Sequence, residues 1–236
     1  ALIGELKAEG ATVIHKCSTL RHALAAERAG ADVLGIVGAE EGGHPGPGDL
    51  STLTLAAAAA RKLRAPFVVG GGVGTGAQIL ALLAAGADGV VMGSRLTVAE
   101  ECRGHPGYKA RIVAADESCS VTVLRSIDAL GGAWRVLRND TSAEVARLEQ
   151  AGARRFEDFR HLIAGTLARD HAYERGEWNR GMVSISPAAG FADRVEPMQA
   201  IFDRLLQEMA DAEDRLGAMK ARALEAAPAR REATSR

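Results

Sequence analysis

The sequence predicts an α/β protein with a parallel sheet of the (β/α)8 TIM-barrel type, and three observations favour this class. Short apolar runs alternate with alanine- and leucine-rich helical segments from residue 11 to residue 95. The run Ala-Gly-Ala-Asp occurs at 29–32 and again at 85–88, each time between a helical segment and an apolar strand. Glycine clusters follow two neighbouring strands, as in the phosphate site at the last strands of a barrel. An open, doubly wound sheet is the alternative.

The region from 11 to 95 contains four strand–helix units, about half of such a barrel. Strands are expected where β-branched and apolar residues form short runs, and helices where alanine and leucine recur at helical spacing before a glycine. The expected strands cover 11–17, 32–37, 66–69 and 89–92. The expected helices cover 2–9, 18–29, 51–63 and 78–85. Ser18 or Thr19 caps the second helix, and Asp32 and Asp88 are expected at turns between helix and strand.

The regular alternation stops at about His105. Beyond it we expect short helices and extended segments, at 106–115, 121–124, 134–137 and 156–168. Between the last two, Thr141 or Ser142 caps a helix, with Glu144 as the capping-box partner of Thr141.

An apolar stripe recurs at helical spacing from Met198 to Met219. It predicts either core packing against the barrel or a contact between subunits of a homodimer. The sequence therefore predicts three parts. They are a half-barrel at 1–140, a helical extension packing on it at 141–225, and a disordered polar tail at 226–236.

Composition argues against several classes of protein. A net charge of −1 over 236 residues gives no basic surface for nucleic acid or for an anionic membrane. No run approaches the roughly 18–20 apolar residues that span a bilayer. No basic, apolar leader opens the chain, so nothing in the sequence indicates export. The cysteines, at 17, 102 and 119, have no CxxC spacing, which favours reduced thiols in a cytoplasm and argues against a zinc site.

The loop between the second strand and the third helix carries the candidate catalytic residue. It reads Glu-Glu-Gly-Gly-His-Pro-Gly from Glu40 to Gly46. Glycines such as Gly43 allow positive φ and a close approach to a flat ligand, and His44 supplies an imidazole, the side-chain type used most often as a general acid or base. The plainer interpretation is a loop histidine hydrogen-bonded to the backbone. Glu40 either orients this loop or is a solvated carboxylate.

Two glycine turns predict a phosphate site. Gly71 and Gly72 follow one strand, and Gly93 and Ser94 follow the next and open a short helix. Their backbone N–H groups can face the same anion, which the helix N-terminus also favours. No Gly-Lys-[Ser/Thr] follows, and no acidic ribose-binding residue accompanies the glycines, so neither a Walker loop nor a dinucleotide site is expected. FMN or a sugar phosphate fits the pattern.

These residues together resemble a known family. The segments that carry the resemblance are His15-Lys16-Cys17, Gly30-Ala31-Asp32, Glu40 to His44, Gly71-Gly72, Gly86-Ala87-Asp88-Gly89 and Met92-Gly93-Ser94-Arg95. The family is that of the nitronate monooxygenases, formerly called 2-nitropropane dioxygenases. The resemblance covers most of residues 1–200, and the Glu-x-Gly-Gly-His loop is its most specific part.

The resemblance implies an FMN-containing barrel that oxidises alkyl nitronates with O2 to a carbonyl compound and nitrite. It implies that His44 deprotonates a neutral nitroalkane or holds the nitronate anion, which suits an imidazole base near pH 7. Residues matching the family's cofactor positions are Gly43, Gly71, Gly72, Gly93 and Ser94, the last standing where threonine is usual. Lys16, at its strand end, either faces the flavin or is a solvated or structural lysine.

Three departures from the family pattern stand out. The four strands match the fifth to eighth of the barrel, so the N-terminal half is expected to lie outside this sequence. The segment at 74–78 replaces a more usual Ala-Asp-Gly-Arg-Gly, and Ser186-Pro187 stands where a Gly-Gln pair is expected near the active site. The last change puts the substrate contacts in question.

Three rival functions share parts of this pattern. A FabK-like enoyl reductase has the same glycine-histidine loop and differs in using NAD(P)H without O2. A catalytically incomplete barrel fragment would act as a binding subunit and retain no flavin. A sugar-phosphate isomerase barrel lacks support, because no paired carboxylate and lysine set stands at the strand ends.

Overall fold

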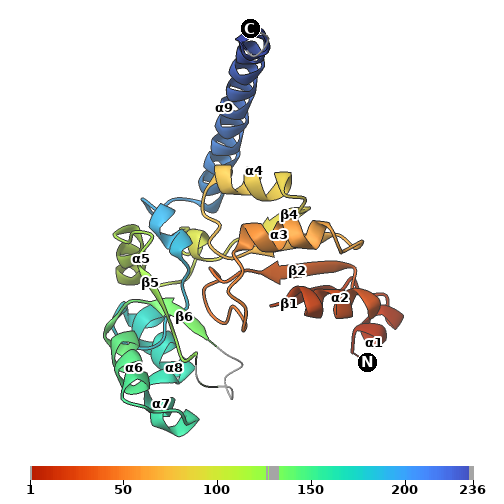
Figure 1. Cartoon of the computed structure of the whole chain (residues 1–236). Coiled ribbons are helices and arrows are strands. Elements are labelled where there is room, and N and C mark those ends of the chain that lie inside the picture. Colours follow the sequence, from red (N-terminus) through yellow and green to blue (C-terminus); the bar gives the residue numbers. More distant parts are fainter. Residues whose placement is uncertain (1, 126, 128–132, 234–236) are drawn as a thin grey trace.

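The first half of the chain forms a four-stranded parallel sheet. The computed structural model describes residues 2–125, 127 and 133–233. The strands are β1 (Ile14–Cys17), β2 (Val33–Val37), β3 (Phe67–Gly70) and β4 (Gly89–Val91). All neighbouring pairs are parallel and the order is β1-β2-β3-β4 (Figure 1). Strand order follows chain order, without the reversal that defines a doubly wound sheet. The α/β class is confirmed, and closure into a barrel stays a prediction.

Three helices cover one face of this sheet, α2 (Leu20–Arg28), α3 (Thr52–Ala60) and α4 (Gly76–Ala84). The helix that precedes the first strand, α1 (Leu2–Ala8), has no buried residue. Small alanines on α2 and α3 let these helices sit close to Leu34, Ile36 and Val69, which are fully buried. Residues on the other face are open, with Ile14 68% and Val91 49% exposed. Apolar residues stand on both faces of the sheet, but among the described residues helices bury only one.

The repeated Ala-Gly-Ala-Asp run has one structural role in both copies. Gly30 and Gly86 end helices with φ of 92° and 102°, a left-handed conformation that glycine adopts without strain. The carboxylate of Asp32 accepts a hydrogen bond from Val13 N at 2.8 Å. Asp88 accepts one from Phe67 N at 2.9 Å. Each aspartate therefore joins its helix–strand turn to the preceding strand, which confirms the predicted turn role.

The second half is irregular, as expected. Its elements are η1 (Ser94–Leu96), α5 (Pro106–Val113), β5 (Ser120–Val123), β6 (Trp134–Leu137), α6 (Asp140–Gln150), α7 (Phe156–Ile163), α8 (Gly165–Leu167), η3 (Ala168–Tyr173) and η4 (Pro187–Phe191). Strands β5 and β6 pair antiparallel. They share a core with α6 and α7, in which Val136, Val145 and Phe159 are fully buried. This second core stands beside the parallel sheet.

The predicted cap of α6 was wrong. The N-cap is Asn139, whose side chain accepts from Ser142 N at 2.8 Å while Ser142 Oγ accepts from Asn139 N at 3.0 Å. Thr141 instead accepts a hydrogen bond from Gly181 N, and Glu144 pairs with Arg147. Asparagine is as good an N-cap as serine or threonine, and the cap lies two residues before Thr141, the first of the two predicted caps.

The last helix, α9 (Met198–Ala233), crosses α4 and then projects from the rest of the chain (Figure 1). The apolar stripe of this helix is therefore buried only in its first part. Ile201 and Leu205 are buried, whereas Leu216 and Met219 are each 54% exposed. The crossing is close: a Cβ on Gly76 would lie 2.1 Å from the carbonyl oxygen of Leu205.

The domain boundaries stay predictions. The expected tail at 226–236 falls partly in α9, which continues to Ala233, and partly outside the described residues. None of the helices in the described ranges is both long enough and apolar enough to cross a membrane.

Candidate active site

The histidine loop between β2 and α3 is held by the β6 strand. Gly43 N donates to the carbonyl of Arg135 at 2.9 Å, and Arg135 N donates to the carbonyl of Gly43 at 2.7 Å. The Arg135 guanidinium also donates to the carbonyl of Ala39, at 3.0 and 3.2 Å. Gly43 has a φ of 97°, which explains the glycine at this position. The loop is thereby fixed at both ends of the Glu-Glu-Gly-Gly-His segment.

The His44 side chain is exposed and lies against Trp134. The two ring centroids are 4.8 Å apart and the planes are tilted by 31°. Trp134 is itself fixed, because its Nε1 donates to Ser184 Oγ at 2.9 Å. Within the described residues the imidazole makes no hydrogen bond to backbone. Its nitrogens are therefore available to a ligand, unlike those of the hydrogen-bonded loop histidine considered above.

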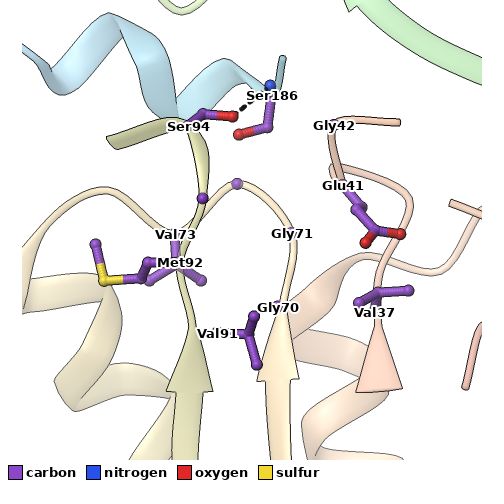
Figure 2. Close-up of a pocket in the computed structure, with 12 residues that line it drawn as sticks. Val37, Glu41, Gly42, Gly70, Gly71, Val73, Val91, Met92, Ser94 and Ser186 are labelled. Carbon is purple, nitrogen blue, oxygen red and sulfur yellow. Dashed lines mark hydrogen bonds between the residues drawn. The ribbon is translucent and has the colours of Figure 1, made fainter. Parts of the chain in front are cut away.

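The two predicted glycine turns meet in one cavity of about 140 Å³ at the carboxyl ends of β3 and β4 (Figure 2). It is lined by Val37, Glu41, Gly42, Gly70, Gly71, Gly72, Val73, Val91, Met92, Gly93, Ser94 and Ser186. Parallel strands end at the same edge of a sheet, so residues about twenty positions apart in sequence come together here. Gly43 and His44 do not line this cavity, although the neighbouring Glu41 and Gly42 do.

The atoms around the cavity suit an anion. Among the loop and side-chain hydrogen bonds of the described residues, none is donated by the backbone N–H groups of Gly72, Gly93 or Ser94. A Cβ built on Gly93 would meet nothing within 4 Å, so the space beside this turn is open. Ser94 begins the short helix η1, and its Oγ accepts a hydrogen bond from Ser186 N at 2.8 Å. Free N–H groups beside open space can cradle a phosphate.

Ser186 is a site residue that the sequence marked only as a departure from a family pattern. Figure 2 shows it next to Ser94 on one side of the cavity. The two serines are 92 positions apart in sequence, so no local pattern reveals this contact.

Lys16 and Glu41 form an ion pair at the cavity. Lys16 Nζ lies 2.5 Å from Glu41 Oε1, and the Lys16 side chain is 62% exposed whereas that of Glu41 is 15% exposed. Burial raises the pKa of the Glu41 carboxyl, opposed by the hydrogen bond and charge of Lys16. Glu41 is a site residue that local sequence patterns did not reveal, since the signal for it is only a second acidic residue before Gly42. Lys16 itself does not line the cavity, and its link to the site is this ion pair with Glu41.

Glu40 orients the loop. Its Oε2 accepts hydrogen bonds from Thr52 N at 2.9 Å and from Thr52 Oγ1 at 3.0 Å. The Thr52 hydroxyl also lies within hydrogen-bond distance of the carbonyls of Gly70, at 3.2 Å, and Gly71, at 2.8 Å. Thr52 starts α3, where a carboxylate is favoured by the helix dipole. Of the two interpretations of Glu40, the structure supports the one in which it positions backbone.

No group of three or more histidine, cysteine, aspartate or glutamate side chains within the described part of the chain is arranged to hold a metal ion.

Comparison with known proteins identifies relatives of the chain. The family model described as nitronate monooxygenase matches residues 1–208. A probable nitronate monooxygenase of Bacillus subtilis is 33% identical over 123 residues, which cover 49% of this chain and 35% of that protein. The chain thus spans about a third of the length of that curated relative.

Two solved structures are similar in fold. FabK from Thermotoga maritima superposes with a TM-score of 0.82 at 30% identity, over 91% of this chain and 66% of that one. A nitroalkane oxidase from Streptomyces ansochromogenes gives a TM-score of 0.74 at 25% identity, over 91% of this chain and 62% of that one.

Proposed function

The chain belongs to the nitronate monooxygenase family, and from that premise we propose that it is part of an FMN-dependent oxidoreductase. The proposed reaction oxidises an alkyl nitronate with O2 to a carbonyl compound and nitrite. The observation that carries the proposal is the cavity in which Gly71, Gly72, Gly93 and Ser94 meet, beside the loop that presents His44. The complete activity, its substrates and its partners are all part of the proposal.

The residues present fit a flavin phosphate. The N–H groups of Gly72, Gly93 and Ser94 are free of other acceptors in the described loops, and the Gly93 turn has open space beside it. The Glu41 carboxylate is balanced by Lys16, so the pair adds little net charge next to a phosphate. When bound, the flavin supplies the one-electron redox chemistry of the reaction.

The protein's own task is proton transfer and positioning. We assign His44 as the base that takes the Cα proton of a neutral nitroalkane, for which an exposed imidazole free of backbone hydrogen bonds is suited. The Trp134 ring blocks one face of the imidazole, and the Gly43–Arg135 pairing holds the loop. A preformed nitronate has already lost this proton and does not need the base.

The test compares His44→Ala with the parent chain on both forms of the substrate. Turnover of neutral nitroalkane should fall about 100-fold or more, the usual contribution of a general base. Turnover of preformed nitronate should fall much less. His22→Ala, at an exposed position on α2, is the matched control and should change neither rate. Equal losses on both substrates would exclude the base role.

A FabK-like reductase is the second candidate, favoured by the TM-score of 0.82 to FabK. It would oxidise NADH or NADPH without O2 in the presence of an enoyl thioester. Anaerobic consumption of NADH, with no turnover of nitronate in air, would select this function. A chain that retains no flavin would instead support the binding-subunit alternative.

The architecture and location are proposals too. We propose that the four strands are part of an eight-stranded barrel whose inner face includes Ile14 and Val91, since both are exposed and apolar. We also propose a homodimer that forms through the exposed apolar residues of α9, Leu216 and Met219. Analytical sedimentation tests it, because the Leu216→Glu variant should be a monomer. A cytoplasmic location follows the expectation from the cysteines.

A further inference from the structure

The Glu41 carboxylate has one satisfied and one unsatisfied oxygen. Oε1 contacts Lys16 Nζ at 2.5 Å. Oε2 is buried and has no hydrogen-bond partner among the described residues. A buried acceptor without a partner is unfavourable, and native proteins usually supply one from the chain, from water or from a ligand. Because Glu41 lines the glycine cavity, a ligand there is in a position to donate to Oε2.

The cavity has two chemically different sides. The N–H groups of Gly72, Gly93 and Ser94, which donate to no other group in the described loops, favour an anion. The Glu41 side of the cavity, near Val37 and Gly71 in Figure 2, offers an acceptor that repels an anion and attracts an O–H or N–H group. At about 140 Å³ the space is smaller than the roughly 300–1,000 Å³ of complete ligand pockets. The anion and the donor must therefore be close together on the ligand.

Lys16 reduces the repulsion between the Glu41 carboxylate and an anion bound in the same cavity. An isolated carboxylate beside a phosphate would oppose binding, but a cation 2.5 Å from Oε1 offsets that charge and fixes the carboxylate. Lys16 extends from β1, is largely exposed, and does not line the cavity itself.

We propose that Glu41 is a ligand-binding residue that accepts a hydrogen bond from a hydroxyl or N–H group next to the phosphate of a bound phosphate monoester. Lys16 acts as a positioning residue for this carboxylate. The inference deepens the proposed function, since it names how the same cavity chooses among phosphate esters. It selects polyol phosphates over phosphates on plain alkyl chains.

The experiment compares two small esters that differ in their hydroxyl groups, glycerol 3-phosphate and propyl phosphate. Binding to the 236-residue chain is measured by calorimetry. The parent chain should bind glycerol 3-phosphate about tenfold more tightly, the value of one charge-assisted hydrogen bond. Glu41→Ala should abolish this preference and bind propyl phosphate at least as well as the parent does. Glu5→Ala, at an exposed position on α1, is the matched control.

Glu41→Gln provides a second variant that keeps the side chain's size and one acceptor oxygen, in case Glu41→Ala fails to fold. It should retain part of the preference. Equal binding of the two esters by the parent chain, binding of neither, or a preference unchanged in both variants would overturn the inference.

An FMN titration in the same chains separates this inference from the proposed function. Loss of FMN affinity of about tenfold in Glu41→Ala supports both. If the parent chain prefers glycerol 3-phosphate but does not bind FMN, the flavin proposal fails and the role of Glu41 stands.

Discussion

The two glycine turns at the cavity are built differently, although both follow a strand of the same sheet. Gly71 has a φ of 114°, and a Cβ there would lie 2.8 Å from Thr52 Oγ1 and 3.0 Å from Glu41 N. Gly93 has a φ of −125°, and a Cβ there would meet nothing within 4 Å. The protein's own atoms therefore require glycine at position 71 and do not require it at position 93.

This difference separates two reasons for a glycine in a loop. At Gly71 the backbone conformation and the packing of the histidine loop demand it. At Gly93 the fold leaves room, so the absence of a side chain serves whatever occupies the room. Substitutions at the two turns should consequently affect different quantities, stability at the first and ligand binding at the second.

Gly71→Ala should have the largest effect on stability. Positive φ costs a non-glycine residue about 1–3 kcal/mol, and the close contacts add to this, so the free energy of unfolding should fall by about 2–4 kcal/mol. Urea denaturation followed by circular dichroism measures it. Gly48→Ala is the control, because a Cβ there meets nothing within 4 Å. A decrease in the free energy of unfolding below about 0.5 kcal/mol would show that the Gly71 turn adjusts to a side chain, and that the contrast with the Gly93 turn is wrong.

Thr52→Val should have an intermediate effect. Thr52 is 4% exposed, and its hydroxyl lies within hydrogen-bond distance of the Gly71 carbonyl and of Glu40. Valine keeps the shape and removes the hydroxyl, so we expect a loss of about 1–2 kcal/mol in the free energy of unfolding. The same denaturation experiment on Thr54→Val, at an exposed position of α3, should give almost no change. Equal losses in both would indicate helix propensity as the cause.

Gly93→Asn and Gly93→Asp should change stability least, by within about 0.5 kcal/mol. They sharpen the comparison because the two side chains are alike in size and differ in charge. FMN titration should show weaker binding for both, and about tenfold weaker binding for aspartate than for asparagine because of repulsion from the phosphate. Identical FMN affinities in the two variants would show that the phosphate of FMN does not bind at this turn.

Local patterns were sufficient for the sheet. Short apolar runs and helix-ending glycines predicted all four strands in order, because those signals lie within a few residues of each other. The repeated aspartates were likewise recognised as turn residues. The cap of α6 was predicted a few residues too late. Asn139 is the N-cap, but the hydroxyl residues Thr141 and Ser142 that follow it are also common at this position.

The site was only partly predictable. The glycines of both turns were found because glycine itself is the signal. The contacts that complete the site were not, as Ser94 meets Ser186 from 92 positions away and Gly43 pairs with Arg135 on a strand of another sheet. The sequence also gave no reason to prefer Glu41 over Glu40. Their contacts in the structure separate them, because Glu41 lines the cavity whereas Glu40 accepts hydrogen bonds from the start of α3.

The pairing of Gly43 with Arg135 also decides how the histidine loop fluctuates. Its backbone hydrogen bonds run to β6, whose other edge belongs to the β5–β6 hairpin and its separate core. Local unfolding of the hairpin would therefore remove both backbone hydrogen bonds of Gly43 while β2 and β3 remain paired. We expect exchange of the Gly43 amide hydrogen to follow the stability of the second core. The start of the loop, where Gly38 N donates to the Gly70 carbonyl, should instead follow the parallel sheet.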